Sequence, residues 1–136
     1  MLFKKYHIEM IKSGLKTETR RNWKKQMVKE NRIYPVQIKM FEPKTLCPLI
    51  KVNYVFRQRL GDMSEIEAYK EGGYTLQEFK KIFSDINGYW DDNLNVYVIG
   101  FEYLKTEFKT AKEIIQEEVT YQKLVKSLRE QFLNGK

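Results

Sequence analysis

The sequence predicts an α+β domain built on a small, partly closed β-barrel. Strand-like stretches precede a pair of helical segments in the middle of the chain, and a strand that is apolar on both faces follows them. A sheet of so few strands hides its edges most simply by curling into a partial barrel. The 136 residues, 42% of them hydrophobic, suffice for one domain with a buried core.

The first 32 residues predict a short helix, a strand and a basic segment. Residues 4–14 carry apolar side chains at helical spacing, and Gly14 is placed to end that helix. Residues 15–21 are rich in threonine, which favours a strand or a turn that enters one. Residues 22–32 are strongly basic and indicate either a long loop or an additional helical turn.

Alternating apolar residues predict two further strands before residue 61. In residues 34–41 we expect Val36, Ile38 and Met40 to point to one side, and a turn with two prolines follows. Residues 49–60 form the second of these strands. Its expected apolar face is made of Ile50, Val52, Tyr54 and Phe56.

Two capping signatures predict the helical pair. Ser64 with Glu67, and Thr75 with Glu78, each place a hydroxyl three residues before a carboxylate, which is the spacing of a capping box. Glycines follow both segments and are placed to end the helices.

A central strand and a long helix complete the chain. Residues 94–104 are apolar on both faces, so we expect them in the middle of the sheet. The stretch 110–133 has the spacing of an amphipathic helix. We therefore divide the chain into a barrel domain, 1–106, and a C-terminal helix, 107–136, that packs on this domain or extends from it.

The charge is unevenly distributed along the chain. The net charge is +7, but residues 1–60 hold 15 Lys and Arg against 4 Asp and Glu, whereas residues 61–136 hold 10 against 14. A basic half predicts a polyanionic partner, and the alternative is a solvated basic surface. The candidate track for a nucleic-acid backbone consists of Lys24, Lys25, Lys29 and Arg32.

Several functional classes are disfavoured by composition. No run of about eighteen apolar residues is present, and the first residues lack a signal-peptide pattern, so we expect neither a membrane span nor secretion. One cysteine and one histidine cannot build the usual four-ligand zinc site. We expect a cytoplasmic protein without metal or cofactor, with His7 on a helix surface and Cys47 either in inert packing or as a loop thiol.

Three motifs in order resemble the ASCH domain, a PUA-like β-barrel family, over residues 3–104. The first is a spaced set of glycine, lysine, threonine and arginine. The second is an alanine followed by a Glu-Gly pair and an aromatic residue, and the third is a strand that ends in Val-x-x-Phe-Glu. The matching residues are Gly14, Lys16, Thr19 and Arg21, then Ala68, Glu71, Gly72 and Tyr74, then Val98, Phe101 and Glu102.

The resemblance implies a possible catalytic set. Some members of the family are amidohydrolases that act on acylated cytidine with a lysine, a threonine and a glutamate, which match Lys16, Thr19 and Glu71. A threonine attacks a carbonyl only when a base takes its proton, and a lysine can do so only if its pKa is lowered. Lys16 must then precede the strand or sit at a bulge, since residues three apart on a strand face opposite ways. The alternative is that Lys16 binds phosphate.

Other residues near this set are candidates for binding nucleic acid. Arg20 and Arg21 should point to opposite faces of a strand. Each either binds a phosphate or base edge or pairs with a carboxylate, Glu71 or Glu102. Trp23 and Tyr74 neighbour polar residues or glycine, so we expect them to be exposed and able to stack on bases.

The leading functional prediction is binding of RNA, other single-stranded nucleic acid or a nucleotide in a basic cleft. The alternative is a metal-independent hydrolase, either an amidohydrolase acting on a modified nucleoside or a single-strand ribonuclease, since some relatives are linked to RNA cleavage. A third possibility is a protein-interaction module that docks through the C-terminal helix.

Overall fold

The structure is a computed structural model that describes residues 1–39, 47–104 and 111–134. Its helices are α1 (Lys5–Ser13), α2 (Glu65–Gly72), α3 (Leu76–Asn87) and α4 (Ala111–Asn134), with a short 3₁₀ turn, η2 (Leu60–Asp62). Its strands are β1 (Glu18–Arg21), β2 (Ile33–Pro35), β3 (Leu49–Arg59) and β4 (Asn95–Tyr103).

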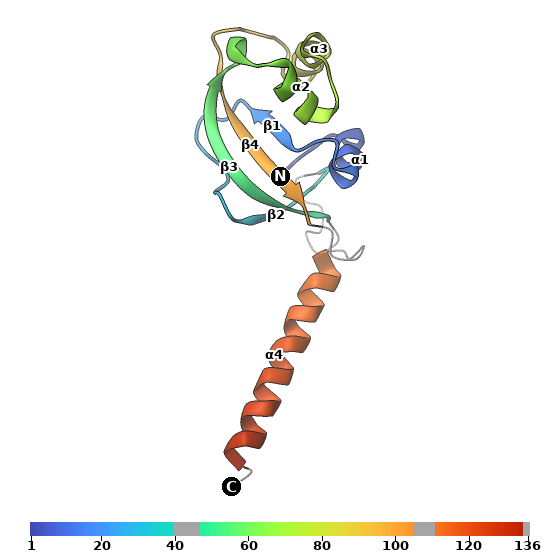
Figure 1. The fold of residues 1–136 in the computed structure, drawn as a ribbon, viewed down its shortest axis with the longest axis vertical. Coiled ribbons are helices and arrows are strands. Elements are labelled where there is room, and N and C mark those ends of the chain that lie inside the picture. The colour runs from blue at the N-terminus through green and yellow to red at the C-terminus, as the bar shows by residue number, and fades with distance from the viewer. Residues whose placement is uncertain (40–46, 105–110, 135–136) are drawn as a thin grey trace.

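The four strands form one antiparallel sheet in the order β1-β4-β3-β2. Long strands β3 and β4 curve together. Helix α1 packs against the sheet in the cluster that includes Ile99 of β4, whereas α2 and α3 pack in the cluster that includes Val96, which faces the other side of that strand (Figure 1). Strand β4 pairs on both edges and its residues 96–101 are all buried. The structure therefore confirms an α+β fold with a curled half-barrel and a central, doubly covered closing strand.

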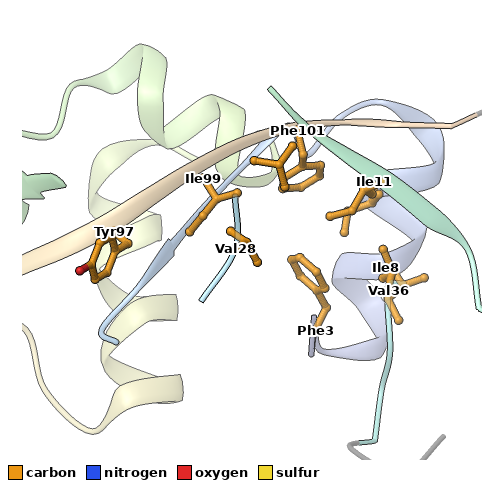
Figure 2. Close-up of a cluster of buried hydrophobic side chains, with 10 residues drawn as sticks. Phe3, Ile8, Ile11, Val28, Val36, Tyr97, Ile99 and Phe101 are labelled. Carbon is orange, nitrogen blue, oxygen red and sulfur yellow. The ribbon is translucent and has the colours of Figure 1, made fainter. Parts of the chain in front are cut away.

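Two apolar clusters hold the helices against this sheet. The larger lies between the sheet and α1 and includes Phe3, Ile11, Val36 and Ile99 (Figure 2). The smaller lies under α2 and α3 and is centred on Phe79 and Phe83, with Leu60, Met63, Ala68 and Val96. The polar site described below lies where α2 meets β1.

Both predicted capping boxes are present. Ser64 accepts from the Glu67 backbone N–H while the Glu67 carboxylate accepts from the Ser64 backbone, and Thr75 with Glu78 repeats the arrangement. Gly14 ends α1 in the left-handed conformation, with φ of 83°. This turn sends the chain from α1 directly into β1.

The predicted face of residues 34–41 is wrong. Val36 is buried, but Gln37 is also buried and Ile38 is 46% exposed, whereas Met40 lies outside the described residues. Strand β2 ends at Pro35, and Gln37 forms a bridge with Leu2 of the N-terminal segment. The alternation expected from a longer strand therefore does not continue past β2.

The predicted apolar face of β3 is right only for its first half. Ile50 and Val52 are fully buried, but Phe56 is 43% exposed. The register with β4 shifts between Val52 and Tyr54, which is the mark of a β-bulge. The shift moves the later side chains to a different side of the sheet.

The basic segment 22–32 is a loop without helix, and one of the two predicted alternatives is thereby decided. Val28 anchors it in the larger apolar cluster, while Lys24, Lys25, Lys29 and Arg32 are exposed. At the other end of the chain, α4 extends away from the sheet (Figure 1). Within the described ranges, no helix is both long and apolar enough to cross a membrane.

Candidate functional site

A cavity of about 430 Å³ lies between β1, the N-terminal segment and α3. One wall is apolar and aromatic, and its side chains belong mainly to α3 and to Trp23, which follows β1. The opposite side is polar and comes from α1, β1 and the end of α2. The apolar wall includes Trp23, Phe79, Ile82, Phe83 and Ile86, and the polar side includes His7, Lys16, Thr19, Arg21 and Glu71.

Lys16 sits before β1, in the turn that follows α1. Its backbone N–H bonds to the carbonyl of Met10, and the strand begins only at Glu18. This placement lets Lys16 and Thr19 face one cavity although they are three residues apart. A site shared by Lys16 and Thr19 requires that Lys16 lie before the regular strand, and the structure places it there.

The Lys16 amine is buried and surrounded by acceptors. Its Nζ donates to the Glu18 carbonyl at 2.9 Å, to the Glu71 carbonyl at 2.8 Å and to Glu71 Oε2 at 2.9 Å. Three acceptors match the three N–H groups of an ammonium. Burial lowers the pKa of Lys16, and the charge of Glu71 opposes this shift.

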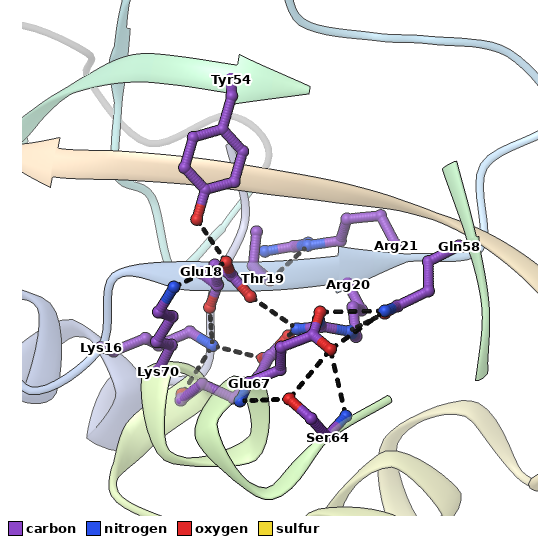
Figure 3. A network of polar contacts seen from close by, with 11 residues as sticks. Lys16, Glu18, Thr19, Arg20, Arg21, Tyr54, Gln58, Ser64, Glu67 and Lys70 are labelled. Carbon is purple, nitrogen blue, oxygen red and sulfur yellow. Dashed lines mark hydrogen bonds and ion pairs between the residues drawn. The ribbon is translucent and has the colours of Figure 1, made fainter. Parts of the chain in front are cut away.

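Glu71 joins Lys16 to Arg20. Its Oε1 accepts from Arg20 NH1 at 3.0 Å while its Oε2 accepts from Lys16. Arg20 also donates to Glu18 at 3.0 Å, to Glu67 at 2.6 Å and to Gln58 at 3.0 Å (Figure 3). The Arg20 side chain has no exposed surface, so its donors are committed to this network rather than to a phosphate.

Thr19 and Arg21 project from the other face of β1. Arg21 Nε donates to Thr19 Oγ1 at 3.1 Å, and its NH2 donates to the Leu2 carbonyl at 2.6 Å. The guanidinium stacks 4.6 Å from the centre of the Phe3 ring. Burial lowers the pKa of Arg21 to about 10, so it stays cationic at neutral pH. Among the described residues, no hydrogen bond joins Lys16 directly to Thr19.

His7 is a site residue that sequence reasoning placed wrongly on the surface. It is only 6% exposed, it lines the cavity, and its Nε2 lies 3.0 Å from the Tyr74 hydroxyl. Burial and then the nearby cations Lys16 and Arg21 lower the pKa of His7 to about 4. The imidazole is therefore neutral at pH 7. The signal that could have found it is its spacing of four from buried Ile11 on the same side of α1.

We expected Trp23 and Tyr74 to be exposed, and this prediction is wrong for both residues. Trp23 is half-buried, with its ring 6.1 Å from that of Tyr97, although it does line the cavity. Tyr74 is also half-buried, lies 6.4 Å from the Phe79 ring and does not line the cavity. Trp23 therefore lines the cavity with part of its ring, whereas Tyr74 contacts His7.

The exposed basic run is separate from the cavity. Lys24, Lys25, Lys29 and Arg32 do not line it. Lys16 and Arg20 are paired with carboxylates, whereas Arg21 and Lys4, which also line the cavity, form no ion pair with a described residue. In the described part of the chain, no three His, Cys, Asp or Glu residues are grouped to hold a metal ion.

Comparison with known proteins identifies the fold. No family model and no curated protein sequence matches the chain. The ASCH domain structure from Lactobacillus crispatus JV V101 superposes with a TM-score of 0.59 at 15% identity, covering 72% of this chain and 70% of that one. A protein from Enterococcus faecalis V583 of the family DUF984 superposes with a TM-score of 0.53 at 18% identity, covering 73% and 70%. The chain therefore has the ASCH-type, PUA-like fold that its three motifs predict.

Proposed function

We propose that this chain binds a nucleotide, either free or within single-stranded RNA, with one base held in the cavity. The observation that carries the proposal is the composition of the cavity: aromatic and aliphatic walls face a side of hydroxyl, guanidinium and imidazole groups. A volume of about 430 Å³ is within the usual size of a small-molecule site. Single-strand readers combine stacking surfaces with polar groups that bond base edges in this way.

The positions of the cations indicate how the ligand would lie. A base would enter between Trp23 and the α3 wall, and its polar edge would meet Thr19 and Arg21. Arg21 ends β1, and Lys24 follows it by three residues, a reach of at most about 10 Å. A polymer whose base occupies the cavity would therefore meet the exposed lysines next, and a free nucleotide would not need them.

A binding panel tests the proposal. Nucleosides, nucleotides and short single-stranded RNAs are titrated while the fluorescence of the protein is followed, because a base stacked near Trp23 would quench it. Ile86→Ala, at a side chain of the cavity wall that is 45% exposed, should weaken binding about tenfold by removing part of that wall, whereas Ile66→Ala, at a side chain 72% exposed on α2, should not. Failure of every member of the panel to bind at millimolar concentration would refute the proposal.

A second candidate function is hydrolysis of an acylated nucleoside. Its specific support is that a buried lysine with a lowered pKa and a threonine hydroxyl held by Arg21 border the same cavity. In such a reaction the Thr19 oxygen would bond to the acyl carbon while its proton passes to neutral Lys16. The leaving amine would then take that proton, and water would release the acyl group from Thr19. Glu71 would position the lysine.

A further inference from the structure

Helix α4 presents an apolar surface to solvent. Its side chains Leu124 and Leu128, which lie one helical turn apart on the same side, are each 56% exposed, and the helix extends away from the sheet (Figure 1). Helices gain most of their stability in water from packing an apolar face, and isolated ones are marginal. Packing of this exposed face of α4 against a partner surface would therefore stabilise the helix.

The spacing of one stripe on α4 is that of a coiled-coil seam. Its positions alternate in steps of three and four, which gives a period of 3.5 rather than 3.6 residues. The stripe spans three heptads of a helix that is about 36 Å long at 1.5 Å per residue. Its positions are Ala111, Ile114, Glu118, Tyr121, Val125, Leu128 and Phe132.

The charges of α4 are segregated along its length. The first half is acidic, with Glu113, Glu117 and Glu118 against Lys112. The second half is basic, with Lys123, Lys126 and Arg129 against Glu130. Two such helices in parallel would place like charges side by side, whereas an antiparallel pair sets each acidic half against a basic one.

We propose that α4 pairs with α4 of a second copy of this chain as an antiparallel coiled coil. We choose a second copy as the partner because the acidic first half of one α4 would lie against the basic second half of the other when the two helices are antiparallel. This dimer carries its two barrel domains at opposite ends of the helix pair.

Sedimentation equilibrium on the full chain tests the pairing. We expect a monomer–dimer equilibrium whose dissociation constant rises about tenfold or more with Leu128→Asp and again with Val125→Asp. Ser127→Asp adds the same charge next to Leu128 but off the stripe, and should leave the constant nearly unchanged. Because Trp23 and Trp90 pack in the two apolar clusters of the barrel domain, unchanged tryptophan fluorescence shows that this domain stays folded in each variant, and far-ultraviolet circular dichroism checks that the helix content is kept.

The orientation is tested by the distance between two spin labels. A label on Lys112→Cys, in a Cys47→Ala background, should give a separation of about 30 Å in an antiparallel pair. A parallel pair would bring the labels within about 20 Å. A short distance, a chain that stays monomeric at all concentrations, or a dimer that tolerates both stripe variants would each overturn the proposal.

Discussion

The phenol of Tyr54 on β3 donates a hydrogen bond to the carboxylate of Glu18 on β1, across the strand that separates them. Gly100 of β4 is aligned with both residues, so the three lie in one row across the sheet. A Cβ placed on Gly100 would lie 2.0 Å from the Tyr54 ring. The missing side chain at Gly100 is therefore what lets the ring cross β4 and reach the buried ion-pair network.

Gly100→Ala should destabilise the domain by about 2 to 4 kcal/mol. The added methyl displaces the ring, and Glu18 then loses a buried partner. Urea denaturation measures the change. Tyr54→Phe keeps the ring and removes only the hydroxyl, so it should cost less, about 1 to 2 kcal/mol. Equal stabilities for wild type and Gly100→Ala would show that Tyr54 does not occupy this row.

Glu71→Gln should lower the free energy of unfolding by about 3 kcal/mol or more. Glu71 is 3% exposed and pairs with both Lys16 and Arg20, so the amide leaves buried Lys16 without its paired carboxylate and takes from Arg20 one of its three carboxylates. The matched control is Glu9→Gln, because Glu9 pairs with Lys12 on an exposed surface of α1. Thermal melts in which the two variants behave alike would contradict the role of Glu71.

Local signals predicted much of this fold. The capping boxes at Ser64 and Thr75 depend on side chains three residues apart, and they form as expected. The apolar run of β4 likewise predicts its central position, since both faces need cover. Spacing and the glycine at position 14 also made it plausible that Lys16 precedes the strand.

Long-range contacts account for what the sequence did not reveal. Gln37 is buried because Leu2, thirty-five positions earlier, bridges to it, and no local pattern records that pairing. The bulge beyond Val52 changes the outward face of β3 without a glycine or proline to mark it. For Arg20, alternation along β1 is visible in the sequence, but the carboxylates that α2 brings to it are not.

The buried setting of His7 can be tested through the pH dependence of the protein's stability. The pKa of His7 is about 4 in the folded protein and near 6.5 when unfolded, so the unfolded chain binds more protons between these values. Stability contributed by neutral His7 is therefore full above about pH 6.5 and is lost as the pH falls toward 4. His7→Gln should reduce this part of the pH dependence of unfolding. An imidazole NMR titration with a midpoint near 6.5 would contradict the buried setting.

The role of the exposed lysines Lys24, Lys25 and Lys29 can be tested through the salt dependence of RNA affinity. If the ligand is a polymer, affinity for single-stranded RNA should fall as salt rises, because each neutralised phosphate releases counterions. Replacing Lys24, Lys25 and Lys29 with alanine should reduce the slope of log affinity against log salt by up to about two. Alanine at the exposed Lys5, Lys12 and Lys81 makes the same change in net charge away from the cavity. Equal slopes for the two triple variants would show that the run 24–29 is only a solvated surface.

Activity on an acylated nucleoside, if present, should rise with pH. In the folded protein Lys16 donates to three acceptors, an arrangement that suits an ammonium, and an ammonium has no lone pair to take the Thr19 proton. Burial lowers its pKa, so the neutral amine gains population as the pH increases, and turnover should level off above that pKa. Lys16→Arg keeps the charge but cannot supply a base, so it should abolish turnover while leaving most ligand binding.

Thr19 separates hydrolysis from binding more cleanly, because its replacement changes little in shape. Thr19→Val removes the nucleophile and the acceptor for Arg21 Nε, whereas Thr19→Ser keeps both. For a hydrolase, we expect no turnover from the valine variant, measurable turnover from the serine variant, and ligand affinity within about tenfold of wild type for each. Turnover that survives Thr19→Val would remove Thr19 as the nucleophile. If wild type binds the nucleoside and releases no product at any pH, hydrolysis is excluded for that substrate and nucleotide binding is the function that this cavity serves.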